Sequence, residues 1–296
     1  MTMTVNRNVP FFNYPRAYLD DRENLMKIFD DVGHRGAFIM QKDLREFEAN
    51  LASYTGASHA IGVANATDGL ELAWMAIGLH PGDEVICCSH TMLATASAIK
   101  TAGGVPVPVE LAEDGLIDPD AVEDAINPRT VGIMPTQLNG RTCDMDRIMS
   151  IAKKHKFFVV EDAAQALGSR FKGKHAGTFG NASAISFFPA KVLGCLGDGG
   201  GVITNDASLF DKIYQLHDHG RDINGDVKSW GRNSRLDNLQ AAILNHNLQS
   251  YEKVITRRRK IATMYQDQLG DLDELQLPPA PDADLNHFDI YQVTLL

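Results

Sequence analysis

The sequence predicts an α/β fold with a mainly parallel sheet. Two observations carry this prediction: apolar runs alternate with helical patterns from about residue 60 onward, and the links between them are short. A third observation is the run Phe-Phe-Val-Val at 157–160, whose continuous apolar, β-rich character is typical of a strand buried on both faces.

The predicted elements follow one another in order. A strand at 60–64 leads into a helix at 68–77, which gathers its apolar side chains on one face and stops at Gly78. The remaining predictions are strands at 84–88, 105–109, 131–135, 157–160, 184–188 and 201–204, and helices at 92–101, 119–126 and 145–156.

The 296 residues suggest one large domain or two ordinary ones. We expect an N-terminal arm and a large domain over 1–235. A long charged helix or kinked helix pair then spans 236–269, and three prolines between 278 and 281 form a stiff connector. Residues 236–296 are thus predicted to hold the helical connection and the start of a second, smaller domain.

The composition narrows the class of protein. Hydrophobic residues make up 44% and charged residues 22%, as in soluble globular proteins, and the net charge of −10 argues against nucleic-acid and anionic-membrane partners. The opening ten residues lack the apolar core of a signal peptide, so a cytoplasmic location is expected. The four cysteines form no C-x-x-C pair, so neither a metal site nor a disulfide framework is predicted.

Two common nucleotide-binding signatures are missing. The sequence has no G-x-G-x-x-G after its first strand and no G-x-x-x-x-G-K-[ST]. The glycine cluster at 197–201 runs into a strand, so it lacks the helix N-terminus that would hold a pyrophosphate, and a tight turn is its simpler interpretation.

Four features together favour a pyridoxal phosphate (PLP) site. Lys191 follows a predicted strand, where burial would lower its pKa and free the amine to form a Schiff base. Asp162, at the end of another strand, could keep the pyridine nitrogen protonated. Thr67 opens a helix directly after a strand and could bind the phosphate, and the loop with His90 and Met92 could reach the ring.

Each feature also has a plainer interpretation when taken alone. Lys191 could be a surface lysine, and Asp162 an ion-paired or capping carboxylate. Thr67 could be an ordinary helix cap, and His90 a satisfied polar residue. The conjunction of the four, rather than any one of them, is what favours the cofactor.

With these segments aligned, the chain resembles the DegT/StrS-type sugar aminotransferases, which are PLP-dependent enzymes of fold type I. The resemblance extends through most of the chain, including Asn65-Ala66-Thr67-Asp68-Gly69-Leu70. It is strongest in three segments: Glu161-Asp162-Ala163-Ala164-Gln165-Ala166-Leu167-Gly168, Gly177-Thr178-Phe179-Gly180, and the stretch 186–200. It implies a fold-type-I large domain followed by an incomplete C-terminal small domain.

The resemblance also implies a role for each matching residue. Lys191 would be the aldimine lysine and proton shuttle, Asp162 the pyridinium partner, and Gln165 a neighbour of the cofactor's phenolic edge. The remaining positions would serve the phosphate and the substrate: Ser186, Thr67 and the amide beside Ala66 would hold the phosphate, Asn233 would reach it from the neighbouring subunit of a homodimer, and Arg221 would contact an anionic substrate.

Three departures from the family pattern stand out. Met92 occupies a position that is often aromatic, so the contact to the ring face is expected from the Met92 sulfur or from His90. Gln137 replaces a frequent histidine, which leaves the choice of substrate open. The chain also stops partway through the expected small domain, soon after the segment 288–292.

The resemblance implies an aminotransferase that moves nitrogen from an amino acid, with glutamate as the expected donor, to a keto sugar, usually nucleotide-linked. Two alternatives remain within the family: a non-catalytic or regulatory PLP-binding relative, and a PLP-dependent keto-sugar dehydratase. Lys191 argues against the dehydratase, because those enzymes carry a histidine at this position. A nicotinamide dehydrogenase has only the fold class in its favour.

Overall fold

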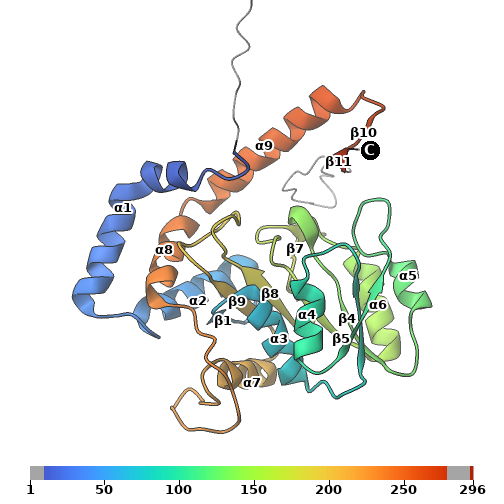
Figure 1. Cartoon of the computed structure of the whole chain (residues 1–296), viewed down its shortest axis with the longest axis horizontal. Helices are drawn as coiled ribbons and strands as arrows, with labels where there is room; N and C mark the ends of the chain where they lie inside the picture. Colours follow the sequence, from blue (N-terminus) through green and yellow to red (C-terminus); the bar gives the residue numbers. More distant parts are fainter. Residues whose placement is uncertain (1–9, 279–293, 296) are drawn as a thin grey trace, which may run out of the picture.

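The computed structural model describes residues 10–278 and 294–295. A helical arm leads into alternating strands and helices, and two helices follow them (Figure 1). In chain order the elements are α1 (Tyr14–Arg35), α2 (Lys42–Thr55), β1 (His59–Val63), α3 (Ala66–Ile77), β2 (Glu84–Cys88), α4 (Ala94–Thr101), β3 (Val105–Val109), α5 (Pro119–Asp124), β4 (Thr130–Met134), η1 (Leu138–Gly140), α6 (Met145–His155), β5 (Phe158–Asp162), β6 (Arg170–Phe171), β7 (Lys174–His175), β8 (Ala182–Ser186), β9 (Gly200–Thr204), α7 (Ala207–His217), α8 (Asn238–Leu248), α9 (Tyr251–Leu269), β10 (Leu275–Gln276) and β11 (Thr294–Leu295).

The seven-stranded sheet has the order β1-β9-β8-β5-β4-β2-β3. Only β9 runs antiparallel to its two neighbours, so the predicted α/β class with a mainly parallel sheet is confirmed. Because β1, β8, β5, β4 and β2 all point the same way, their carboxyl ends meet at one edge, where ligands of open α/β sheets collect.

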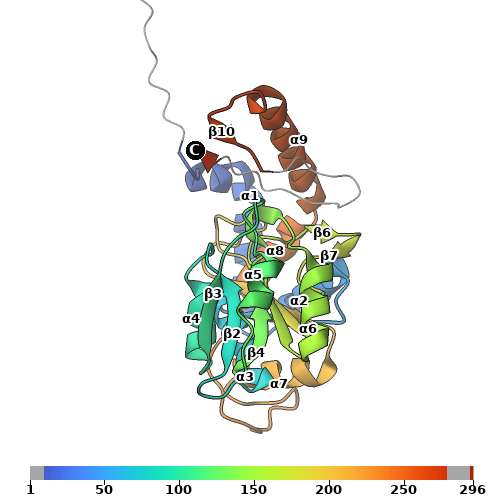
Figure 2. The ribbon, with the colours of Figure 1, turned by 90° about the vertical axis from the view of Figure 1, so that its right-hand side faces the viewer.

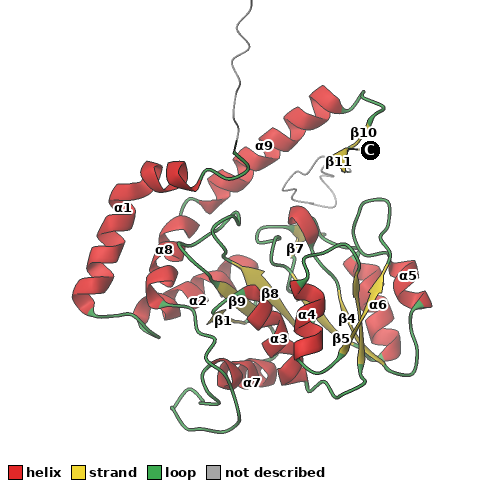
Figure 3. Ribbon diagram, in the orientation of Figure 1, coloured by secondary structure: helices red, strands yellow, loops and turns green. Residues whose placement is uncertain are grey.

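Helices cover both faces of this sheet (Figures 2 and 3). Successive strand residues point to opposite faces, so Val160 packs in a core with α3, α4 and α7, whereas Val159 packs in a core with α5 and α6. A further core joins α2 and α8 over the β8 and β9 end of the sheet. Both faces are therefore apolar, as the sequence of β5 predicts.

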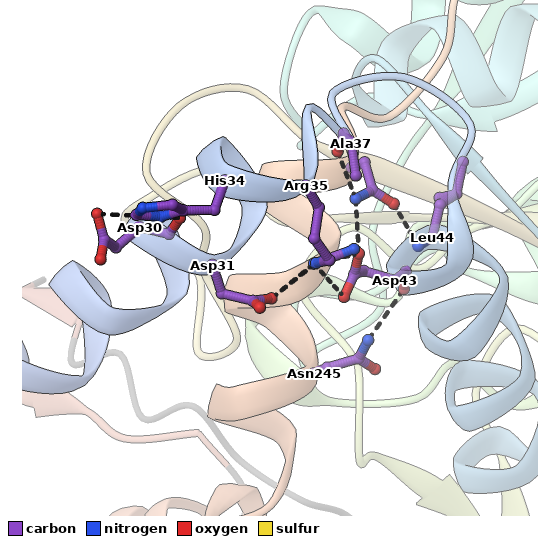
Figure 4. A network of polar contacts seen from close by, with 9 residues as sticks. Asp30, Asp31, His34, Arg35, Ala37, Asp43, Leu44 and Asn245 are labelled. Carbon is purple, nitrogen blue, oxygen red and sulfur yellow. Dashed lines mark hydrogen bonds and ion pairs between the residues drawn. The ribbon is translucent and has the colours of Figure 1, made fainter.

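A polar network joins the arm to α8, the helix that leads into α9. The Arg35 guanidinium contacts Asp31 and Asp43, and Asn245 donates to the Asp43 carbonyl oxygen at 2.9 Å (Figure 4). The fully buried Asn238 donates to the Ala37 carbonyl at 2.7 Å and accepts from the Leu44 amide at 3.0 Å. These contacts tie the arm and α2 to α8, which precedes α9 in the chain.

The predicted boundaries of the strands and helices between residues 60 and 204 agree with the structure to within two residues, and the largest differences have local causes. The helix after β1 begins at Ala66, not 68, because the Asn65 side chain caps it by accepting from the Asp68 amide at 2.8 Å. The strand predicted at 184–188 is in fact Ala182–Ser186, since Phe188 already lies in a turn. Strand β5 includes both acidic residues because the Asp162 amide still donates to the Pro135 carbonyl at 2.9 Å.

The region predicted at 236–269 is a pair of helices, α8 and α9, that meet near residue 250. Helix α8 packs on α2 of the large domain. The division at residue 235 stays a prediction, and most of the proline-rich connector falls outside the described residues. Across the described ranges, none of the helices combines the length and apolar character that a bilayer crossing requires.

Candidate active site

A cavity of about 760 Å³ opens at the carboxyl edge of the sheet. Four of the predicted site residues line it: Lys191, Ser186, Gln165 and His90. The wall also carries Arg258 from α9, and none of the described lining residues is an aspartate or glutamate. Arg258 is a permanent cation on this wall, which makes the cavity suited to anionic ligands. The other lining residues are Phe11, Phe12, Thr91, Leu138, Asn139, Ala164, Leu167, Phe188, Ala190, Val192, Leu193 and Tyr251.

Lys191 lies in the turn after β8, where its amide donates to the Phe188 carbonyl at 2.8 Å. Burial lowers the pKa of its amine, and the negative charge of Asp162 partly opposes this shift. A lowered pKa increases the fraction of neutral, nucleophilic amine. The position and environment fit the role that the sequence predicts.

Asp162, the last residue of β5, is 4% exposed. Its Oδ2 accepts from the Thr95 hydroxyl at 2.7 Å and its Oδ1 from the Ala164 amide at 3.2 Å. Burial raises the pKa of this carboxyl, while the two donors and Lys191 oppose the rise. A cationic ring nitrogen placed beside it would offset the cost of burying its charge.

Gln165 is held by the turn at 137–140. Its Oε1 accepts from the Asn139 amide at 3.0 Å, and Asn139 adopts the left-handed conformation with φ 57°. An amide N–H needs an acceptor, so this contact assigns the side-chain oxygen to Asn139 and leaves the NH₂ group as the donor on the cavity side.

Ser186 and the start of α3 approach each other through the register of three strands. Ser186 pairs with Gly200, which in turn pairs with Val63, three residues before Ala66. Strand β9 passes so close to the helix that a Cβ at Gly200 would lie 2.6 Å from the Ala66 nitrogen. The first N–H groups of a helix have no acceptor within it and bind anions well, so Ser186, Ala66 and Thr67 can form one anion site.

The loop after β2 separates the two residues expected near the ring face. His90 lines the cavity. Met92 does not: its side chain is 65% exposed, and its sulfur accepts from the Ala94 amide at 3.1 Å. Of the two alternatives from the sequence, only His90 is brought to the cavity within one chain.

Asn233 and Arg221 also lie away from this cavity wall. Both belong to the long segment between α7 and α8, where Asn233 pairs with Asp218 in an antiparallel bridge and Arg221 lies 3.9 Å from the Asp218 carboxylate. Next to Asn233, the Ser234 hydroxyl accepts from the Ala64 amide at 3.4 Å, which ties this segment to the end of β1.

Gln137 does not reach the cavity either. It is fully buried, donates to the Glu161 carboxylate at 2.7 Å and accepts from the Cys143 amide at 2.7 Å. It therefore supports the loop around the site, and its side-chain oxygen and nitrogen are used within the protein.

Comparison with known proteins gives the family. The model of the DegT/DnrJ/EryC1/StrS aminotransferase family matches residues 19–296. The chain belongs to this family. It is 40% identical over 278 residues to the dTDP-3-amino-3,4,6-trideoxy-alpha-D-glucose transaminase of Streptomyces venezuelae, covering 93% of this chain and 73% of the relative.

Two further known proteins are similar to the chain. The UDP-2-acetamido-2-deoxy-3-oxo-D-glucuronate aminotransferase of Pseudomonas aeruginosa is 41% identical over 262 residues, which is 88% of this chain and 72% of the relative. The crystal structure of NtdA from Bacillus subtilis with bound cofactor PMP superimposes with a TM-score of 0.88 at 33% identity, covering 97% of this chain and 66% of that one. The predicted fold type, PLP dependence and aminotransferase class are thus confirmed.

The residues present fit the family's cofactor. A nucleophilic amine, a buried carboxylate without a described cationic partner other than Lys191, and an anion site at a helix N-terminus lie along one sheet edge. These are the groups that the aldehyde, the pyridine nitrogen and the phosphate of PLP require. Among the described residues, no cluster of three or more potential metal ligands occurs.

Several residues of the site were missed from the sequence. Thr91, Thr95 and Thr136 contact one another or Asp162. Arg258 lines the cavity from α9, which the sequence predicts only as part of a long charged helix. No local motif marks them, because they converge only through the order of the strands and the direction of α9.

Proposed function

We propose that the chain transfers an amino group from glutamate to a nucleotide-linked keto sugar. The observation that carries the proposal is the large cavity that holds the Lys191 amine and the Arg258 guanidinium, with no carboxylate among its described lining residues. Both proposed substrates are anions, through the carboxylates of glutamate and the diphosphate of the sugar nucleotide. Support also comes from the relatives, whose names specify a dTDP-linked and a UDP-linked sugar.

PLP, when bound, withdraws electrons from the substrate carbon so that it can lose and regain a proton. The chain's own residues would divide the remaining work. The Lys191 amine would carry the proton to and from that carbon, and Asp162 would hold a positive charge at the ring nitrogen. Ser186 and the α3 N-terminus would anchor the phosphate, and Gln165 would donate a hydrogen bond from its NH₂ group.

Arg258 would bind an anionic group of a substrate at the outer wall. In the described part of the chain no carboxylate lies within ion-pair distance of its guanidinium, so it is available to an incoming carboxylate or phosphate. Arg221, which does not line this wall, would contact the substrate from a neighbouring subunit.

The proposed assembly is a homodimer with shared sites. The segment between α7 and α8 exposes apolar side chains, with Trp230 at 95%, Ile223 at 74% and Val227 at 70%. Such a cluster is costly in water and favours a protein interface. Asn233, in the same segment, would reach the partner's phosphate site. A cytoplasmic location, expected from the sequence, stays a prediction.

The first test is the visible absorption of the protein with PLP, before and after glutamate. A band that requires Lys191 and that glutamate bleaches, with release of 2-oxoglutarate, is the expected result. The amino group should then be transferred to a nucleotide-linked keto sugar. A Lys191-dependent band that no amino acid alters would favour the regulatory alternative.

Mixing two inactive variants tests the shared site. Lys191→Ala and Asn233→Ala chains should each lack activity, whereas a heterodimer would contain one site with both residues intact. Random exchange of subunits should therefore restore about a quarter of the wild-type activity. Activity that stays at the level of the separate variants would contradict the shared site.

A further inference from the structure

Asp162 sits at the end of a chain of threonine hydroxyls. Thr95, in α4, is fully buried and donates to the Asp162 carboxylate at 2.7 Å. Thr91 lies 2.7 Å from the Thr95 hydroxyl, and Thr136 donates to Thr91 at 3.1 Å. Thr91 and Thr95 follow β2, Thr136 follows β4 and Asp162 ends β5, so three adjacent strands contribute to one chain.

The direction of the hydrogen bonds follows from counting protons. A threonine hydroxyl has one proton, and an ionised carboxylate can only accept. Since Thr95 donates to Asp162, Thr91 must donate to Thr95, and the proton of Thr136 points to Thr91. All three dipoles thus point toward the carboxylate, and aligned hydrogen bonds strengthen one another.

We infer that this hydroxyl chain, through Thr95, keeps Asp162 ionised and thereby keeps the pyridine nitrogen of bound PLP protonated. Thr95, Thr91 and Thr136 would be positioning residues that act through Asp162. The inference rests on the proposed role of Asp162 as the partner of that nitrogen. It names the hydrogen bonds that would keep the pyridine nitrogen protonated, the state in which the ring withdraws electrons.

The surroundings of Asp162 support this role. Its carboxyl is buried, and burial alone would raise its pKa and favour the neutral acid, which cannot stabilise a cation. The Thr95 hydroxyl is the largest opposing influence, followed by the Ala164 amide and the charge of Lys191. The other titratable group that senses Asp162 is the Cys88 thiol, whose pKa is raised mainly by burial.

The test measures the pyridine nitrogen directly. PLP labelled with ¹⁵N at the ring is bound to the full chain, and the ¹⁵N chemical shift is followed against pH, because it distinguishes the protonated from the neutral nitrogen. Thr95→Val removes the hydroxyl while keeping the shape of the side chain. It should lower the pH of half-protonation by about one unit, the size expected for one hydrogen bond to a charged group.

Two variants serve as matched controls. Thr95→Ser restores a hydroxyl and should return the value to that of the wild type. Thr101→Val removes a hydroxyl from the same helix, where it donates only to the Ser97 and Ala98 carbonyl oxygens, and should leave the nitrogen unchanged. A merely structural effect of valine in α4 would not follow this pattern.

The outcomes separate the inference from the role on which it rests. If Asp162→Asn leaves the nitrogen protonated, the proposed role of Asp162 is wrong. If Asp162→Asn removes the proton but Thr95→Val does not lower the half-protonation pH, the hydroxyl chain is irrelevant and the inference alone fails. Should Thr95→Val not bind PLP, Thr91→Val decides: a smaller shift in the same direction supports the chain, and no shift overturns it.

Discussion

His175 should make the free energy of unfolding depend on pH in the acidic range. The residue is 1% exposed and lies in β7, behind the turn that carries Gln165 and Leu167 to the cavity wall. Its Nε2 accepts from the Gly168 amide at 2.8 Å, and its Nδ1 contacts the Ala176 carbonyl oxygen. A proton added at Nε2 would face the Gly168 N–H, so this site requires the neutral ring.

Burial lowers the pKa of His175 to about 4 from the ordinary 6.5, with a smaller contribution from the charge of Arg170. The unfolded chain therefore binds a proton at a higher pH than the folded chain. The stabilisation is fully present above pH 6.5 and is lost as the pH falls toward 4. A depression of this size corresponds to about 3 kcal/mol.

Another buried group acts in the opposite sense. Burial raises the pKa of Glu48 to about 7, so the folded state gains a proton there first, and this contribution grows as the pH falls. The wild-type pH profile alone would mix the two effects. Comparison with His175→Gln cancels Glu48, because both proteins retain it.

The assay is urea unfolding of wild type and His175→Gln between pH 4 and 8, at fixed protein and PLP concentrations. The advantage of the wild type over the variant should shrink by about 3 kcal/mol from pH 7 to pH 4. A difference that stays constant across this range would show that His175 does not titrate as its hydrogen bonds imply.

Two further substitutions test other parts of the site. Gly200→Ala places a methyl group 2.4 to 2.8 Å from backbone atoms of Asn65 and Ala66, at the predicted phosphate site. It should weaken PLP binding about tenfold or more, with little change in the binding of pyridoxal, which lacks the phosphate. Gly33→Ala, at an open position in α1, is the control and should stabilise the fold by up to about 1 kcal/mol. Glu161→Gln should lower the free energy of unfolding by about 3 kcal/mol in urea titrations. Four N–H groups donate to the two carboxylate oxygens of Glu161, and glutamine keeps only one of these oxygens as an acceptor. A loss below about 1 kcal/mol would contradict this reasoning.

Much of the fold could be predicted because apolar periodicity reports burial, and burial decides where strands and helices form. Lys191, Ser186 and Gln165 could be predicted for a related reason: they lie at or after the carboxyl ends of strands, and these ends share one edge of the sheet. The chain of threonine hydroxyls could not be predicted. Thr91 and Thr136 are 45 residues apart in the sequence, and Thr95 and Asp162 are 67 apart. They meet only because β2, β4 and β5 are neighbours in the sheet, an order that the sequence does not give.

The adjacent carboxylates Glu161 and Asp162 show where sequence reasoning reaches its limit. Both end a buried strand, and either could serve a cationic ligand. Alternation along β5 turns their side chains to different surroundings. Glu161 accepts from Gln137 and from three backbone amides at 177–180, so its acceptors are already used within the protein. Asp162 accepts only one hydrogen bond at each oxygen and lies near Lys191, so of the two carboxylates it is the one with lone pairs left for a cationic ligand.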